Sequence, residues 1–156
     1  MLNENTILLP SGAYRLNNLT SLNSATACQI AMEMANVTPL EWPGNQQVLN
    51  LTMIERLNEL DGSGELTRKL INMYFDFSAH ILTELCQTTN SLNDLARHIH
   101  SLKASSANLG MDRVAAILQY VEHLNSTDLN FMPAVRLLAD EIEKGNNALK
   151  EWLSAR

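Results

Sequence analysis

The residues best suited to chemistry in this chain are a histidine and a lysine one helical turn apart, His100 and Lys103. A neutral imidazole nitrogen is a competent nucleophile near neutral pH. An ammonium group three positions further along a helix can offset the negative charge of a phosphoryl group carried on that nitrogen. The pair therefore predicts a histidine that accepts a phosphoryl group and a lysine that stabilises the negative charge of that group.

The histidine lies beside the apolar stripe of a predicted helix rather than within it. That stripe has the i, i+3, i+4 spacing of a helix with one face in a core, and it consists of Leu92, Leu95, Ile99, Leu102 and Ser106. At about 100° per residue, the side chains that share the face of His100 are Ala96, Lys103, Ala104 and Ala107. Because these neighbours are mostly small, a second protein could approach closely, and we expect an exposed imidazole on a flat surface.

The run from His100 to Gly110, His-Ser-Leu-Lys-Ala-Ser-Ser-Ala-Asn-Leu-Gly, resembles the histidine-containing phosphotransfer (HPt) domains of phosphorelays. Those domains usually carry His-x-Leu-Lys-Gly, then small residues, a hydrophobic residue and glycine, within a four-helix bundle. The resemblance extends over approximately residues 50–152. It implies that His100 is the phosphorylated residue, that Lys103 contacts the phosphate, and that Ser105 and Gly110 belong to the close-packed surroundings.

Two positions depart from the family pattern. Ala104 replaces the usual glycine after the lysine, a mild change that keeps the surface flat. Glu122 stands where some members carry a glutamine that is hydrogen-bonded to the histidine. Whether Glu122 orients His100 is left open by the sequence.

The resemblance also implies a function and a set of partners. A receiver domain bearing an aspartyl phosphate would dock on the histidine helix, and the phosphoryl group would pass to His100 and then to another receiver. Receiver domains, a hybrid sensor histidine kinase, or both are the expected partners. The receiver would supply Mg²⁺, so we expect no cofactor in this chain. The absence of a G-x-x-x-x-G-K-[ST] loop favours a phosphoryl carrier over an ATP-dependent kinase.

Two other classes of function remain as alternatives. The chain could be a helical adaptor or a kinase-inhibitory binding module in which His100 is chemically silent. A metal-binding bundle that uses His98 and His100 is a weaker hypothesis, because side chains two positions apart on a helix point about 200° away from each other. We therefore predict no metal site.

Composition limits the partners further. The 156 residues are 46% hydrophobic and 18% charged, which fits one ordinary domain with some additional sequence. A net charge of −6 argues against nucleic acid as a partner. No apolar run approaches the roughly 18 residues of a membrane span, so we expect no direct membrane insertion and a cytoplasmic location. Cys28 and Cys86 are interpreted as free thiols in a reducing compartment.

The chain divides into an arm and a bundle. Residues 1–49 are interpreted as an N-terminal arm or linker, in which residues 25–36 could form a short helix, and residues 50–156 as the HPt-like bundle. Thr52 is the predicted cap of a short helix, Ser91-x-x-Asp94 the capping box of the histidine helix, and Asp112 the cap of the next one. The first bundle helix is expected to bury Leu66, Leu70, Met73, Phe77, Ile81 and Leu85. The predicted fold is all-α: an antiparallel up-down four-helix bundle with short extra N-terminal helices.

Overall fold

The computed structural model describes residues 6–9, 12–15, 44–87 and 92–156. Their elements, in chain order, are β1 (Thr6–Leu9), β2 (Gly12–Arg15), α2 (Leu51–Asp61), α3 (Glu65–Gln87), α4 (Leu92–Asn108), α5 (Asp112–Glu122) and α6 (Phe131–Ser154). From residue 44 onward every described element is a helix, which confirms the predicted helical bundle.

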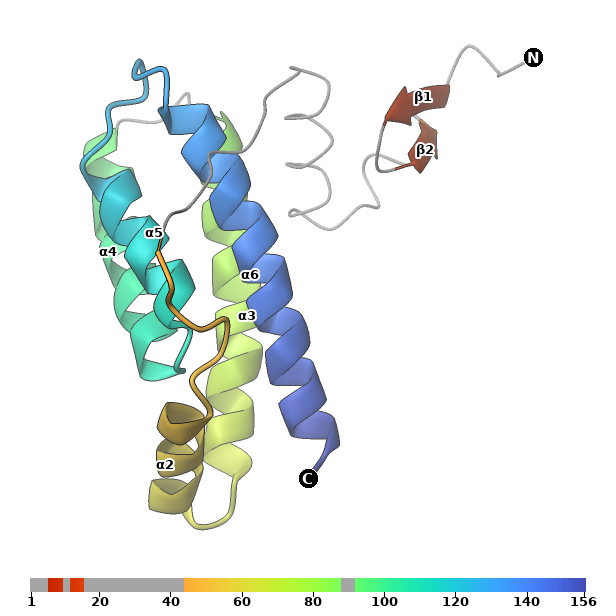
Figure 1. The fold of residues 1–156 in the computed structure, drawn as a ribbon, viewed down its shortest axis with the longest axis vertical. Helices are drawn as coiled ribbons and strands as arrows, with labels where there is room; N and C mark the ends of the chain where they lie inside the picture. The colour runs from red at the N-terminus through yellow and green to blue at the C-terminus, as the bar shows by residue number, and fades with distance from the viewer. Residues whose placement is uncertain (1–5, 10–11, 16–43, 88–91) are drawn as a thin grey trace.

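Helices α3 to α6 form the antiparallel up-down four-helix bundle. Helix α3 packs against α4 and α6, and α5 packs against the same two helices, so each member has two neighbours. Figure 1 shows α3 and α6 running the length of the molecule, while the shorter α4 and α5 lie along one part of them. The short helix α2 packs against α3 and occupies the end of the molecule that α4 and α5 do not reach.

The buried face of α3 differs from the predicted one over its first half. Leu66 and Met73 are 51% and 57% exposed, whereas the residues buried in the core are Thr67, Ile71, Tyr74, Ser78, Ile81, Leu82 and Leu85. The prediction counted only apolar residues, and the core-facing row contains the polar Thr67 and Ser78. Ser78 can be buried because its hydroxyl donates to the carbonyl of Phe75 at 3.1 Å. The prediction is confirmed at Ile81 and Leu85, which are fully buried, and Phe77 is partly buried against the core.

The start of α2 was also predicted two residues too late. Asn50, rather than Thr52, is the N-cap: its side-chain oxygen accepts a hydrogen bond from the backbone N–H of Met53 at 3.4 Å. The same side chain donates to Asp112 Oδ2 at 3.1 Å. Asp112 was the predicted cap of α5, but it lies in the first turn of that helix, after Met111. Asn50 therefore links the beginnings of two helices.

The turn between α4 and α5 fixes the relative position of these helices. Gly110 ends the histidine helix, as predicted, with a φ of +79°, which glycine adopts without steric cost. Its carbonyl accepts a hydrogen bond from the backbone N–H of Asn50 at 2.7 Å. A Cβ at Gly110 would lie only 2.5 Å from the carbonyl oxygen of Asn50. The segment that precedes α2 is therefore packed directly on the α4–α5 turn.

Helix α5 is also tied to α6 by a buried charge. Glu141 of α6 is 2% exposed, and its carboxylate forms ion pairs with Arg113 of α5 at 3.2 Å and with Lys144 at 2.9 Å. Pairing on both sides offsets part of the cost of removing this carboxylate from water. The contact holds α5 in place alongside the core residues Ile117, Leu118 and Val121.

The N-terminal region contains a feature that the sequence did not predict. β1 and β2 pair as an antiparallel two-stranded sheet, with Thr6 opposite Arg15 and Leu9 opposite Gly12. The predicted short helix at residues 25–36 lies outside the described residues, as do Cys28 and Ser91. Cys86 is not a free thiol in the structure, so that prediction is wrong for Cys86.

Candidate functional site

Helix α4 presents His100 to solvent because its other side is held in the core. Leu95, Ile99, Leu102 and Ser106 are buried, as the helical spacing predicted. The side chain of His100 is 70% exposed. Ala96, Ala104 and Ala107, which share its face, are exposed as well. The structure therefore places a reactive type of side chain on an exposed, small-residue face of α4.

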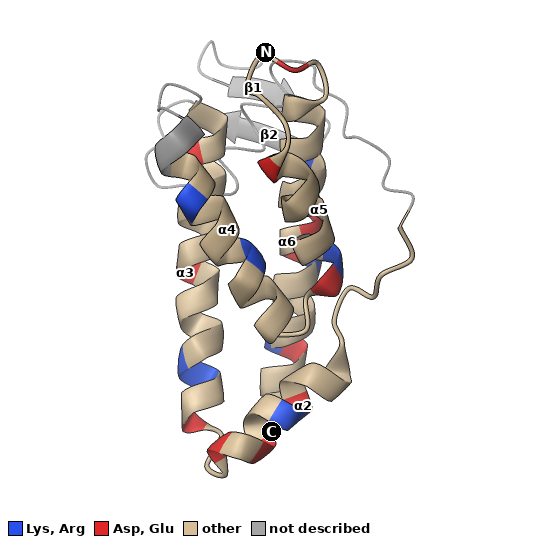
Figure 2. Ribbon diagram, turned by 90° about the vertical axis from the view of Figure 1, so that its left-hand side faces the viewer, with Lys and Arg blue, Asp and Glu red and all other residues tan. Residues whose placement is uncertain are grey.

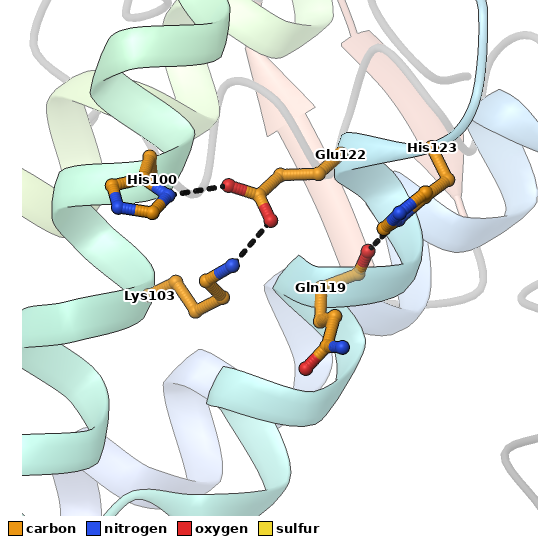
Figure 3. Close-up of polar contacts among 5 residues, drawn as sticks. All are labelled: His100, Lys103, Gln119, Glu122 and His123. Atoms are coloured by element: carbon orange, nitrogen blue, oxygen red, sulfur yellow. Dashed lines mark hydrogen bonds and ion pairs between the residues drawn. The ribbon is translucent and has the colours of Figure 1, made fainter.

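The carboxylate of Glu122, from the last turn of α5, joins His100 and Lys103 (Figure 3). One oxygen, Oε1, lies 3.1 Å from His100 Nδ1, and the other, Oε2, accepts a hydrogen bond from Lys103 Nζ. Because an ionised carboxylate can only accept, the Nδ1 atom must be the donor. In the neutral imidazole the remaining ring nitrogen, Nε2, is then the unprotonated one, and Figure 3 shows it on the side of the ring away from Glu122.

The surroundings of Glu122 keep it ionised. Partial burial acts to raise the pKa of its carboxyl group, but the hydrogen bonds and positive charge of Lys103, together with those of His100, outweigh burial and lower the pKa overall. The side chain is 17% exposed. An ionised acceptor is therefore held beside the imidazole at neutral pH.

Lys103 is only partly exposed, although it shares the helix face of His100. Its side chain is 24% exposed and lies between α4 and α5, where its ammonium group is bonded to Glu122. The lysine stem covers part of the helix interface, while the charged end stays close to the histidine (Figure 3). The structure thus brings together His100, Lys103 and Glu122, which are three of the predicted site residues.

Two other predicted site residues lie away from this group. The hydroxyl of Ser105 donates to the carbonyl of Ser101 at 2.9 Å, which is the local backbone bond that competes with any ligand. Gly110 is buried at the far end of α4, where its contacts are Asn50 and Met53. Its place in the fold is the turn that positions α5, and through α5 the carboxylate of Glu122.

The other histidines have partners of their own. Glu84 of α3 bridges His98 on α4 at 3.0 Å and His80 at 3.3 Å, on a different side of α4 from His100. His123 follows Glu122, but its Nδ1 atom lies 2.7 Å from the backbone carbonyl of Gln119 (Figure 3). In the described part of the chain, no three potential metal ligands are grouped as a metal site requires.

Sequence reasoning missed an apolar groove beside the histidine helix. It has a volume of about 810 Å³ and is enclosed by α2, α3 and the last turns of α4. Its walls include Met53, Leu57, Leu70, Met73, Tyr74 and Phe77, and its α4 edge is formed by Ser105, Asn108 and Leu109. Three apolar residues that were predicted to face the core of α3, Leu70, Met73 and Phe77, line this groove. That misplaced stripe was the available sequence signal.

Charge and hydropathy add little to the definition of the site. Lys and Arg positions alternate with Asp and Glu positions along the described helices (Figure 2). Among the described helices, none is both long and apolar enough to cross a membrane.

Comparison with known proteins identified a family. Residues 69–155 match the family model of the Hpt domain, which is more than half of the 156 residues. No curated protein and no solved structure matched the chain. The matched range begins in the first turns of α3, ends after α6, and contains His100, Lys103 and Glu122.

Proposed function

Since the chain belongs to the Hpt domain family, whose members have a phosphotransfer role in phosphorelays, we propose that His100 accepts a phosphoryl group from a receiver-domain aspartate and passes it to another receiver. The observation that carries this proposal is the contact between His100 and Glu122. It leaves Nε2 on the side of the ring away from Glu122, on a side chain that is 70% exposed and so accessible to a partner. We place this relay step in the cytoplasm, as the sequence predicts.

Glu122 has a positioning role in this proposal. Its hydrogen bond fixes both the ring orientation and the tautomer of His100, so the Nε2 lone pair is available for attack on phosphorus. The nucleophile then needs no general base, because it carries no proton to remove. A glutamine could orient the ring through its carbonyl oxygen, and a carboxylate adds a full negative charge.

Lys103 has an electrostatic role. Its ammonium group is already within one helical turn of His100 and is held there by Glu122. When the phosphoryl group arrives on Nε2, a flexible lysine can move toward the new negative charge at little cost. Lysine suits this role because its charge is compact and mobile.

The docking surface has two parts in this proposal. The flat face of Ala96, Ala104 and Ala107 allows the receiver's acidic pocket to approach His100 closely. The apolar groove next to it offers area that small residues cannot supply, and Met73 on its wall is 57% exposed. The receiver contributes the aspartate and the Mg²⁺ ion that neutralises the phosphoryl group in flight. This chain contributes the nucleophile and the ammonium group.

A transfer assay tests the proposal. The full chain is incubated with a panel of phosphorylated receiver domains and analysed by intact mass, with His100→Gln compared with wild type. We expect an acid-labile, base-stable phosphoryl adduct that is lost in His100→Gln. His98→Gln is the matched control, because His98 lies on the same helix and is bonded to Glu84 instead. No adduct from any receiver, or an adduct that survives in His100→Gln, would refute the carrier function and favour the adaptor.

A second variant tests the part assigned to Lys103. Lys103→Ala removes the ammonium group but leaves the contact between His100 and Glu122 available. We expect slower phosphoryl transfer with an unchanged folded structure, measured by rapid-quench kinetics and circular dichroism. Transfer at the wild-type rate would remove this residue from the mechanism.

A further inference from the structure

The position of Glu122 has a consequence for the phosphorylated state of His100. When Nε2 attacks the phosphorus of an aspartyl phosphate, the new N–P bond forms as the P–O bond breaks, and the electron pair of that bond goes to the aspartate oxygen. The Nδ1 proton takes no part in the step and stays between the ring and Glu122, 3.1 Å from Oε1. Directly after transfer, the phosphorylated ring therefore carries a proton on Nδ1 and a positive charge.

That proton controls how easily the phosphoryl group leaves. In the return step an acceptor carboxylate oxygen forms a P–O bond, the N–P bond breaks, and its electron pair stays on Nε2. If Nδ1 is protonated, the leaving group is a neutral imidazole. If Nδ1 has lost its proton, the leaving group is an imidazolate anion, which departs far less readily. The lability of the N–P bond thus depends on the Nδ1 proton.

Resting on the proposed function, we infer that Glu122 retains the Nδ1 proton on phosphorylated His100 and so keeps the N–P bond labile to higher pH than an uncharged partner would. The carboxylate faces Nδ1 directly from α5 and has a pKa below its ordinary value, so it remains charged throughout the relevant range. A negative charge in hydrogen-bond contact favours the positively charged form of the ring.

The other charged groups around the ring are weaker candidates for this effect. Lys103, on the same helix, opposes protonation of the ring, but its ammonium group is bonded to the second oxygen of Glu122. On α5, His123 is turned toward the backbone carbonyl of Gln119. On α3, Glu84 is occupied by His98 and His80.

One further cation precedes the histidine on its own helix. Arg97, one turn before His100 on α4, is exposed and therefore strongly screened by water. Among the described residues, Glu122 is the anion in direct contact with His100.

The experiment compares rates of N–P hydrolysis as a function of pH. The full-length wild type, Glu122→Gln and Glu84→Gln are loaded with the small-molecule donor phosphoramidate, so loading does not depend on any receiver. Loss of the phosphoryl group is followed by intact mass from about pH 6 to about pH 9, the range that brackets imidazole titration. The His100→Gln protein, treated in the same way, gives the background from other histidines.

We expect the midpoint of the pH profile to fall by about one unit in Glu122→Gln, which corresponds to roughly tenfold slower hydrolysis on the alkaline side. Glutamine can still accept the Nδ1 hydrogen bond, so a purely structural role would leave the midpoint unchanged. Glu84→Gln makes the same change of charge at the other bridging carboxylate, and its pH profile of hydrolysis should match that of wild type. Superimposable profiles for wild type and Glu122→Gln would overturn the inference. Failure of receiver transfer, by contrast, would refute the proposed function alone.

Discussion

The close packing of Gly110 against Asn50 leads to a quantitative prediction for Gly110→Ala. Gly110 has a φ of +79° and would place a Cβ 2.5 Å from the Asn50 carbonyl oxygen, a backbone atom that cannot rotate away. The positive φ alone costs about 1–2 kcal/mol for alanine. Relief of the clash by backbone movement adds about 1–3 kcal/mol, as overpacking typically does. We expect a loss of about 2–5 kcal/mol in the free energy of unfolding.

Gly62→Ala is the matched control for this prediction. Gly62 also has a positive φ, +68°, but a Cβ there would meet nothing within 4 Å. It should therefore lose only the conformational part, about 1–3 kcal/mol for a backbone with ψ −37°, outside the left-handed helical region. Urea denaturation followed by circular dichroism measures both variants against wild type, with the slope of the transition checked for two-state behaviour. Equal losses at the two glycines would show that the close approach to Asn50 carries no energy, and the reasoning would fail.

Three further outcomes follow from the contacts described above. Tyr74→Phe should lower the free energy of unfolding by about 1 kcal/mol, because it removes the 2.9 Å hydrogen bond to Ser106 Oγ. The Ser106 hydroxyl keeps its hydrogen bond to the carbonyl of Leu102. Urea denaturation measures the loss, and an unchanged free energy of unfolding would contradict the prediction. Met73→Asp should weaken receiver binding in calorimetry and leave phosphoramidate loading of His100 intact, and unchanged affinity would exclude the groove from the docking surface. The carboxyl group of Glu122 has a lower pKa in the folded chain than in the unfolded chain, so its ionised form stabilises the fold above the unfolded pKa of about 4.5. This stabilisation is lost as the pH falls through the folded pKa. The free energy of unfolding of Glu122→Gln should therefore decline less steeply than that of wild type below about pH 4.5, and equal declines in acid titrations would refute this.

The exposure of His100 was predictable because it depends only on local geometry. Once Leu95, Ile99 and Leu102 define a buried stripe, the 100° step of the helix places His100 outside it. The same method failed on α3, where two apolar rows compete. The row through Met73 faces the groove, and the row that enters the core contains Thr67 and Ser78. Apolar periodicity cannot choose between rows when the buried one contains polar residues.

The contact between His100 and Glu122 could not be derived from periodicity or spacing. These residues are 22 positions apart and on different helices. Their meeting depends on the turn at Gly110, on the packing of α4 against α5, and on the hydrogen bond from Asn50 that supports the turn. Family resemblance marked the position of Glu122, but only the fold shows that one carboxylate serves both His100 and Lys103.

Under the proposed function, the split of the site across two helices makes acceptance of a phosphoryl group conditional on folding. His100 and Lys103 come from α4, whereas Glu122 comes from α5, so a slip of one helix against the other by a single residue, about 1.5 Å, would separate them. A partly unfolded chain would then lose the fixed tautomer and the poised ammonium group together. Partly unfolded copies of the protein would be excluded from phosphoryl transfer without a separate recognition step, because the hydrogen bond between His100 and Glu122 that prepares the nucleophile requires α4 and α5 to be packed together.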